Sequence, residues 1–191
     1  MLVAGRRHLF HRAHSAGRMM AGSGPNHALM HDGLILHNDS EMRTPLSMNG
    51  LVAKAQCVVW TRRKKSALDA PRVLVVDDFT DTADAISMVL AIGGFDSNAV
   101  YSGRRAIDTI GQWHPQIVLL DIWMPDMSGL EVATHLRANA STSDTVLIAH
   151  SAASSESDLE RAKQAGFDAF CAKPTDSAIL APLLRHFVPD A

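Results

Sequence analysis

The stretch IVLLDIWMPDMSG, from Ile117 to Gly129, decides the fold of this chain. Its first four residues are apolar without alternation, which is typical of a strand covered on both faces, as in a parallel sheet between helices. Asp121 then stands at the carboxyl end of that strand. In open α/β sheets, ligands bind at this edge, where the strand order reverses. Asp121 is therefore the first candidate functional residue.

From residue 72 the chain repeats this order of a short apolar strand followed by a longer helical stretch. Five such units in about 120 residues predict a doubly wound parallel sheet with helices on both faces. Serines are expected to cap helix starts, and glycines to end helices in the left-handed conformation. The expected strands are 73–76, 99–101, 117–120, 145–149 and 169–172; the expected helices are 81–92, 103–113, 129–138, 156–165 and 177–187; the expected caps are Ser102, Ser128 and Ser155, with Gly93, Gly94 and Gly166 at helix ends.

Polar residues follow four of the expected strands. Asp77 and Asp78 follow the first strand, Asp121 the third, Ser151 the fourth and Lys173 the fifth. The carboxyl ends of parallel strands share one edge, so the three carboxylates are expected to cluster, and they repel one another unless a cation compensates. Carboxylate oxygens suit Mg²⁺, so the charge count predicts a divalent ion. Lys173 and Ser151 are expected to hold the oxygens of an incoming phosphoryl group.

These motifs together resemble the receiver domain of two-component response regulators. The resemblance covers residues 72–188 and rests on VLVVDD, DIWMPDMSG, Ser151 and Lys173-Pro174, which occur in order, with 30 residues from Asp121 to Ser151 and 22 from Ser151 to Lys173. It implies a flavodoxin-like, five-stranded parallel sheet with strand order 2-1-3-4-5.

The resemblance also implies a role for each residue at the metal end of the site. Asp121 is the expected phosphoacceptor, a carboxylate nucleophile that forms an aspartyl phosphate. Asp78 is expected to ligate Mg²⁺ directly, and Asp77 mainly through metal-bound water. The backbone carbonyl of Trp123 is expected to supply a further ligand.

A second group of residues is implied to carry the signal. Lys173 is expected to pair with the phosphoryl group, and Ser151 to hydrogen-bond to it and move when it arrives. Phe170, three residues before Lys173, matches the aromatic residue that turns inward as Ser151 moves. The rearranged surface is then read by partners.

The implied function is that of a phosphoacceptor in a two-component phosphorelay. It takes a phosphoryl group from a histidine kinase or a histidine phosphotransfer protein and signals through contacts with a downstream protein. No enzyme activity is expected beyond Mg²⁺-dependent self-phosphorylation and autodephosphorylation, and a homodimer is left open. The alternatives are the receiver end of a truncated hybrid histidine kinase, a phosphorylation-independent scaffold, and a nucleic-acid binder acting through a basic tail.

The first seventy residues differ in charge from the remainder. Residues 1–70 carry ten Lys or Arg against four Asp or Glu, a net +6, whereas 71–191 carry eight against sixteen, a net −8. We therefore expect a partly disordered basic extension over 1–70 and the receiver domain over 71–191. Apolar residues are dense enough for a helix over 34–60, although Pro45 and Gly50 interrupt it. The basic run 62–65 is typical of a solvated linker.

Within the extension, SEMRTPL from Ser40 to Leu46 resembles the phosphoacceptor box of sensor histidine kinases. Serine stands where that box has its phosphorylated histidine. A hydroxyl cannot form a phosphoramidate, so this segment is interpreted as a degenerate remnant of a kinase dimerisation helix.

The remaining composition bears on location and output. Cys57 and Cys171 are the only cysteines and lie in different halves, which argues against a disulfide framework and favours the cytoplasm. No apolar stretch reaches the roughly 18 residues of a transmembrane helix, so no membrane contact is expected. No recognition helix follows the last expected helix, so no DNA-binding output domain is expected.

Two residues near the strand ends lack the small polar side chains that could guide a water molecule to the phosphoryl group. Trp123 is bulky two positions after Asp121, and Ala153, two positions after Ser151, brings no polar group. The hypothesis is that these side chains screen the phosphoryl group and slow its hydrolysis.

Overall fold

The computed structural model describes residues 29–31, 34–36, 57–61, 63–65, 70–152 and 154–188. The kinase-like box at 40–46 and Ala153 lie outside the described residues. The helices of the described residues are α2 (Thr80–Ile92), α3 (Gly103–Trp113), α4 (Gly129–Ala138), α5 (Glu156–Gln164) and α6 (Ser177–Phe187). The strands are β1 (Leu29–His31), β2 (Leu34–Leu36), β3 (Cys57–Val59), β4 (Arg72–Val76), β5 (Asp96–Val100), β6 (Ile117–Leu120), β7 (Val146–Ser151) and β8 (Ala169–Ala172).

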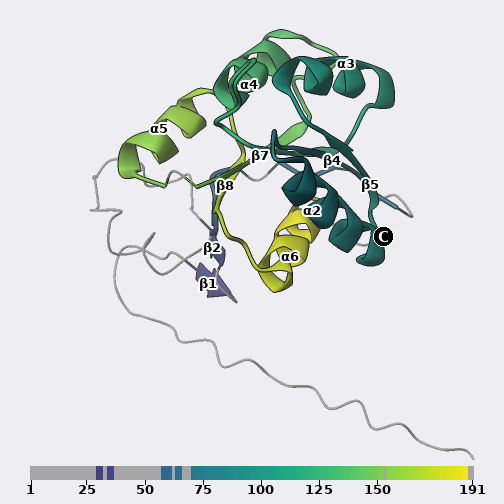
Figure 1. The fold of residues 1–191 in the computed structure, drawn as a ribbon. Coiled ribbons are helices and arrows are strands. Elements are labelled where there is room, and N and C mark those ends of the chain that lie inside the picture. The colour runs from purple at the N-terminus through teal and green to yellow at the C-terminus, as the bar shows by residue number, and fades with distance from the viewer. Residues whose placement is uncertain are drawn as a thin grey trace, which may run out of the picture.

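The strands form a single sheet in the order β1-β2-β3-β8-β7-β6-β4-β5. The five strands from β4 onward are mutually parallel, and their order is the expected 2-1-3-4-5. Figure 1 shows α3, α4 and α5 over one face of this sheet and α2 and α6 over the other. The predicted flavodoxin-like architecture is therefore confirmed.

The expected number of strands was too small. β3 pairs antiparallel with β8, β2 pairs parallel with β3, and β1 pairs antiparallel with β2, so the described sheet has eight strands rather than five. The physical reason is that β8 would otherwise be an edge strand with unpaired backbone groups. The segment Cys57–Val59, which the apolar density placed in a helix, contains two valines suited to a strand and supplies the missing partner.

Alternate residues of the central strands fill two separate cores. Ile117 and Leu119 face the layer of α2 and α6, whereas Val118 and Leu120 face the layer of α3, α4 and α5. Successive side chains of a strand point to opposite faces, so an unbroken apolar run is required when both faces are covered. This explains why the sequence of β6 shows no alternation.

The predicted serine caps are present, whereas Gly93, expected to be left-handed, ends α2 with a φ of −74°. Ser102, Ser128 and Ser155 each accept a hydrogen bond from a backbone amide in the first turn of α3, α4 and α5. Gly94 and Gly166 take positive φ angles of 87° and 94° after α2 and α5. These caps fix where each helix begins and ends, and hence where the loops at the carboxyl edge of the sheet lie.

The expectation about the cysteines is overturned. Cys57 and Cys171 form a disulfide across 114 residues, because they are direct partners in the β3–β8 register with Cα atoms 4.2 Å apart. That expectation treated the two halves of the chain as structurally separate. They are not separate, because β3 of the first half pairs with β8 of the second.

Candidate functional site

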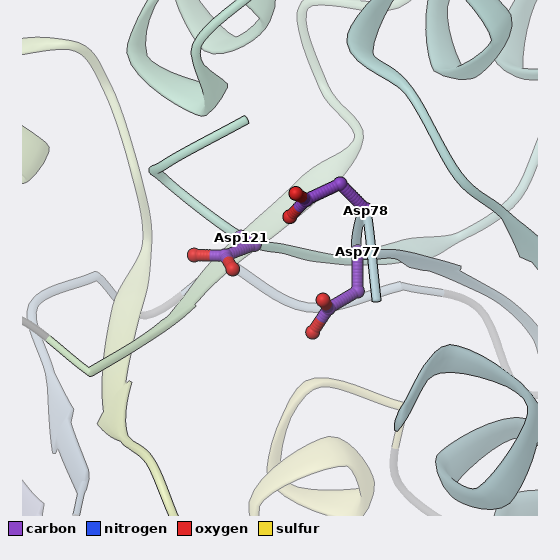
Figure 2. A group of neighbouring side chains, drawn as sticks. All are labelled: Asp77, Asp78 and Asp121. Atoms are coloured by element: carbon purple, nitrogen blue, oxygen red, sulfur yellow. The ribbon is translucent and has the colours of Figure 1, made fainter. Parts of the chain in front are cut away.

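Three carboxylates meet at the carboxyl edge of the sheet, where β4 and β6 are neighbours. Val76 and Leu120, the last residues of these strands, are register partners, so Asp77, Asp78 and Asp121 follow side by side. One oxygen from each carboxylate lies within 4.8 Å of one from each of the others. Figure 2 shows the three side chains extending into the same space. The structure thus brings together the acidic cluster that the sequence predicted.

Backbone hydrogen bonds hold two of these carboxylates in place. The amide of Phe79 donates to Oδ1 of Asp77 over 3.0 Å, and the amide of Trp123 donates to Oδ1 of Asp121 over 3.2 Å. The amide of Asp121 in turn donates to the carbonyl of Val76 over 2.8 Å, which ties the end of β6 to that of β4. The oxygens are therefore oriented by the fold itself.

Lys173 is the cation of the cluster. Its Nζ donates to Oδ2 of Asp77 and to Oδ2 of Asp121, each over 2.6 Å. Burial alone would lower the pKa of Lys173, but the hydrogen bonds and charges of Asp121 and Asp77 outweigh it and raise that pKa above its ordinary value. Lys173 is thus a fixed positive charge beside the Asp121 carboxylate.

Two polar atoms at the site are buried without a hydrogen-bond partner among the described residues. They are Oγ of Ser151 and Oδ1 of Asp78. Ser151 is fully buried as the last residue of β7, and its carbonyl accepts from the amide of Lys173 over 2.9 Å. Buried polar groups are nearly always paired, so each of these two atoms has hydrogen-bonding or ligating capacity that the described residues do not use. An unpartnered oxygen beside two further carboxylates fits a hard cation such as Mg²⁺.

The loop after Asp121 closes tightly and depends on glycine. A Cβ atom on Gly129 would lie 2.2 Å from the carbonyl oxygen of Asp121, and its amide donates to the carbonyl of Ile122 over 2.9 Å. Only a residue without a side chain fits there. The motif ending in Gly129 therefore sets the position of Asp121 as well as the start of α4.

Asp126 joins this loop to α3. It accepts hydrogen bonds from the backbone amides of Gly103 and Arg104 at the start of α3, each over 3.1 Å. Burial would raise the pKa of Asp126, but these amides lower it below its ordinary value. A carboxylate favours a helix N-terminus for the same reason.

Trp123 lies at the outer side of the site. Its side chain is 54% exposed, and the Arg161 guanidinium of α5 lies 5.7 Å from the centre of one of its rings, within range of a cation–π contact. No described contact tests the metal-ligating role of its carbonyl, which stays a prediction. Ala153, the second residue of the hypothesis on slow phosphoryl hydrolysis, lies outside the described residues.

Phe170 and His150 lie deeper, on β8 and β7. Phe170 is buried in the core shared with α5 and packs against Trp60, with ring centres 6.5 Å apart. His150 is buried, and its Nε2 lies 3.2 Å from Oγ1 of Thr175. Burial and the neighbouring Lys173 lower the pKa of His150 to about 4, so this ring is neutral at ordinary pH.

Asp168, a buried carboxylate just before β8, carries no local sequence pattern that indicates its role. It accepts hydrogen bonds from the amide of Leu147, the guanidinium groups of Arg137 and Arg63, and the hydroxyl of Thr61. Arg63 belongs to the run expected to be a solvated linker, yet its guanidinium contacts the buried Asp168 beside β8. A contact over 105 residues leaves no trace in local sequence patterns.

Comparisons with known proteins identify similar chains. The family model described as the response regulator receiver domain matches residues 73–185. The polar-differentiation response regulator DivK of Brucella ovis is 28% identical over 119 residues, which cover 62% of this chain and 97% of DivK. The transcriptional regulatory protein PrrA of Mycobacterium leprae is 34% identical over 109 residues, covering 57% of this chain and 46% of PrrA.

Solved structures show the same fold. The chemotaxis protein CheY4 of Vibrio cholerae superimposes with a TM-score of 0.60 at 22% identity, covering 62% of this chain and 99% of CheY4. The signal receiver domain of a LuxO repressor protein from Vibrio parahaemolyticus gives a TM-score of 0.57 at 31% identity, covering 62% and 90%. Among the described residues, every helix is too short or too polar to cross a bilayer.

Proposed function

Because this chain belongs to the response regulator receiver family, we propose that it accepts a phosphoryl group on Asp121 and passes the signal on through protein contacts. The observation that carries the proposal is the placing of one ammonium group, Nζ of Lys173, 2.6 Å from both Asp121 and Asp77, beside the unpartnered hydroxyl of Ser151. A nucleophile, a cation and a hydrogen-bond donor thus converge where a phosphoryl group would arrive.

The reaction is an in-line transfer. A carboxylate oxygen of Asp121 attacks the phosphorus of a phosphohistidine, the bond from phosphorus to the ring nitrogen breaks, and an aspartyl phosphate forms. Lys173 exchanges its contact with Asp121 for a phosphoryl oxygen and neutralises part of its charge. Ser151 donates its hydroxyl hydrogen to another phosphoryl oxygen, which satisfies its buried Oγ.

Asp77, Asp78 and Asp121 are the residues that would hold Mg²⁺, with the carbonyl of Trp123 as a further ligand. The ion would offset the charge of the phosphoryl oxygens as they approach three carboxylates. The hydrogen bonds from the amides of Phe79 and Trp123 leave the second oxygens of Asp77 and Asp121 directed toward Lys173.

The signal is proposed to leave through β7 and β8. Ser151 moves toward the phosphoryl group, Phe170 takes up the space that this movement frees, and the surface around β7, α5 and β8 changes between two states. The donor is proposed to be a histidine kinase or a histidine phosphotransfer protein in the cytoplasm. The match to DivK, a response regulator by name, supports a role in two-component signalling.

The proposal is tested by incubating the protein with Mg²⁺ and acetyl phosphate. Intact mass should rise by about 80 Da, the mass of a phosphoryl group. Asp121→Asn should abolish the gain, whereas Asp126→Asn, which changes a carboxylate five residues away in the same loop, should retain it. Absence of the gain in the parent, or its persistence in Asp121→Asn, would refute the proposal.

A further inference from the structure

The segment 57–65 lies against the receiver part of the chain as a strap, a name we use for its described residues, 57–61 and 63–65. It begins as β3, and beyond it the amide of Trp60 donates to the carbonyl of Asp168 over 2.8 Å. The hydroxyl of Thr61 donates to the Asp168 carboxylate over 2.7 Å. The amide of Lys65 donates to the carbonyl of Phe187 over 2.8 Å, at the end of α6. The strap therefore spans from β8 to the last helix.

The strap covers the aromatic side chain proposed to switch. Val58 is the register partner of Phe170, and the Trp60 and Phe170 rings meet at an interplanar angle of 47°. Phe170 is only 2% exposed and Trp60 only 6%, although β8 would otherwise stand at the edge of the sheet. Phe170 consequently cannot change position without disturbing Trp60.

The covered residue is in turn connected to the phosphoryl site. Ser151 is the register partner of Ala172, two residues beyond Phe170, and its carbonyl accepts from the amide of Lys173. A movement of Ser151 toward a phosphoryl group thus acts on β8 at the point where the strap lies. Coupling of this kind is reciprocal, so holding the strap restrains the movement of Ser151.

A covalent bond holds the strap at this point. Cys57 and Cys171 are joined on the face of the sheet opposite Phe170, and Cys171 is the residue next to Phe170. Disulfides of cytosolic proteins are usually transient and either catalytic or redox-sensing. Both cysteines are fully buried, so a reductant reaches the sulfur atoms only after the strap has opened locally.

We propose that the Cys57–Cys171 disulfide is a redox lock on the signalling switch. In the oxidised protein the strap is fixed over Phe170, and the rearrangement that follows phosphorylation of Asp121 is restrained. In the reduced protein the strap can separate from β8, and Phe170 can follow Ser151. This inference rests on the proposed function, because it assigns a regulator to the same switch.

The chemistry of unlocking is a two-electron thiol–disulfide exchange with a dithiol. A thiolate of the dithiol attacks one cystine sulfur, the S–S bond breaks, and the other cysteine leaves as a thiolate that takes a proton. The second thiol of the reductant then displaces the remaining cysteine and closes its own disulfide. The protein gains two thiols, and the dithiol is oxidised by the same two electrons.

The test measures backbone hydrogen exchange of 58–61 in the strap and of 118–120 in β6. Oxidised and dithiothreitol-reduced protein are compared with and without Mg²⁺ and acetyl phosphate, and intact mass reports phosphorylation in each sample. In reduced protein that carries the added phosphoryl mass, backbone exchange in the strap should be about tenfold faster than in oxidised protein, while β6 stays protected. In oxidised protein, phosphorylation should leave backbone exchange in the strap unchanged.

Variants separate the lock from simple stabilisation. Cys57→Ala should behave as reduced protein in every condition, and Cys171→Ala, which removes the same bond from the β8 side, should do the same. Equal strap exchange in oxidised and reduced phosphorylated protein would overturn the lock. An equal rise in the strap and in β6 on reduction would also overturn it, because the disulfide would then stabilise the whole fold without gating the strap.

The same samples distinguish failure of the lock from failure of the proposed function. If no form gains the phosphoryl mass, the proposed function fails, and the lock is judged on Asp121→Asn protein. Reduction of that variant should raise exchange in the strap alone, and unchanged strap exchange would overturn the lock.

Discussion

Nζ of Lys173 lies 2.6 Å from Oδ2 of Asp121, so the proposed nucleophile is already paired with the cation that would neutralise its phosphoryl group. The same ammonium contacts Asp77 at 2.6 Å, and these contacts tie the loop that follows β8 to the residues that follow β4 and β6. The site is therefore organised around one shared cation.

Removing that cation should impair phosphoryl transfer more than it impairs folding of the site. Lys173→Met is expected to slow the gain of phosphoryl mass from acetyl phosphate by at least about tenfold, because charge on the transferred group is no longer offset. Lys163→Met, a matched change of an exposed lysine on α5, should leave the rate unchanged. Equal rates in Lys173→Met and the parent would contradict this role.

The unpartnered hydroxyl of Ser151 leads to a prediction about stability. Ser151→Ala removes a buried oxygen that lacks a hydrogen bond, so the free energy of unfolding without phosphodonor should change by less than about 1 kcal/mol. Thr142→Val is the matched control, because the buried hydroxyl of Thr142 donates to the carbonyl of Leu136 over 2.9 Å. That variant should lose about 1–2 kcal/mol in urea denaturation. A larger loss in Ser151→Ala than in the control would show that its hydroxyl is already bonded.

The buried histidine predicts how stability depends on pH. The pKa of His150 is lowered from 6.5 to about 4 in the folded protein, with Lys173 and Asp77 as the charges facing it. Between these values the unfolded chain binds more protons, so the His150 contribution to stability is complete above pH 6.5 and is lost as pH falls toward 4. The loss amounts to about 3 kcal/mol.

His150→Gln should remove this part of the pH dependence, measured as the difference in unfolding free energy between pH 6.5 and pH 4. His135→Gln, a change of an exposed histidine on α4, should retain the full dependence of the parent. If His150→Gln and the parent lose stability in parallel, the ring does not titrate as described.

Trp123 is expected to lengthen the life of the aspartyl phosphate. The hypothesis is that its bulky ring, which has the Arg161 guanidinium 5.7 Å from its centre, limits the approach of water to the phosphoryl group. Trp123→Asn should therefore lose the phosphoryl mass several times faster than the parent once phosphodonor is removed, while Trp123→Phe should stay close to the parent. A time course in which Trp123→Asn is no faster would refute the screening hypothesis.

The sequence predicted the parts of the fold that local patterns determine. The unbroken apolar run of β6, the serine caps at Ser102, Ser128 and Ser155, and the carboxylates after β4 and β6 all follow from short-range rules. The convergence of Asp77, Asp78 and Asp121 follows from strand order, which the resemblance to receiver domains implied.

The parts that escaped prediction depend on contacts between distant residues. Cys57–Val59 is too short for a periodic pattern to indicate its secondary structure. It forms a strand because β8, 114 residues away, offers an open sheet edge. Asp168 has no local mark of its role and is defined by Arg63, Arg137 and Thr61. Tertiary pairing of this kind overrides the local helical pattern that the sequence suggested.

The most direct measurement of the central claim locates the phosphoryl group in the chain. Protein treated with Mg²⁺ and acetyl phosphate is reduced with borohydride, which converts an aspartyl phosphate to homoserine, and the peptides are mapped by mass spectrometry. We expect homoserine at position 121 and unchanged aspartate at 77, 78 and 126. Homoserine at another position, or unmodified aspartate at all four, would contradict it.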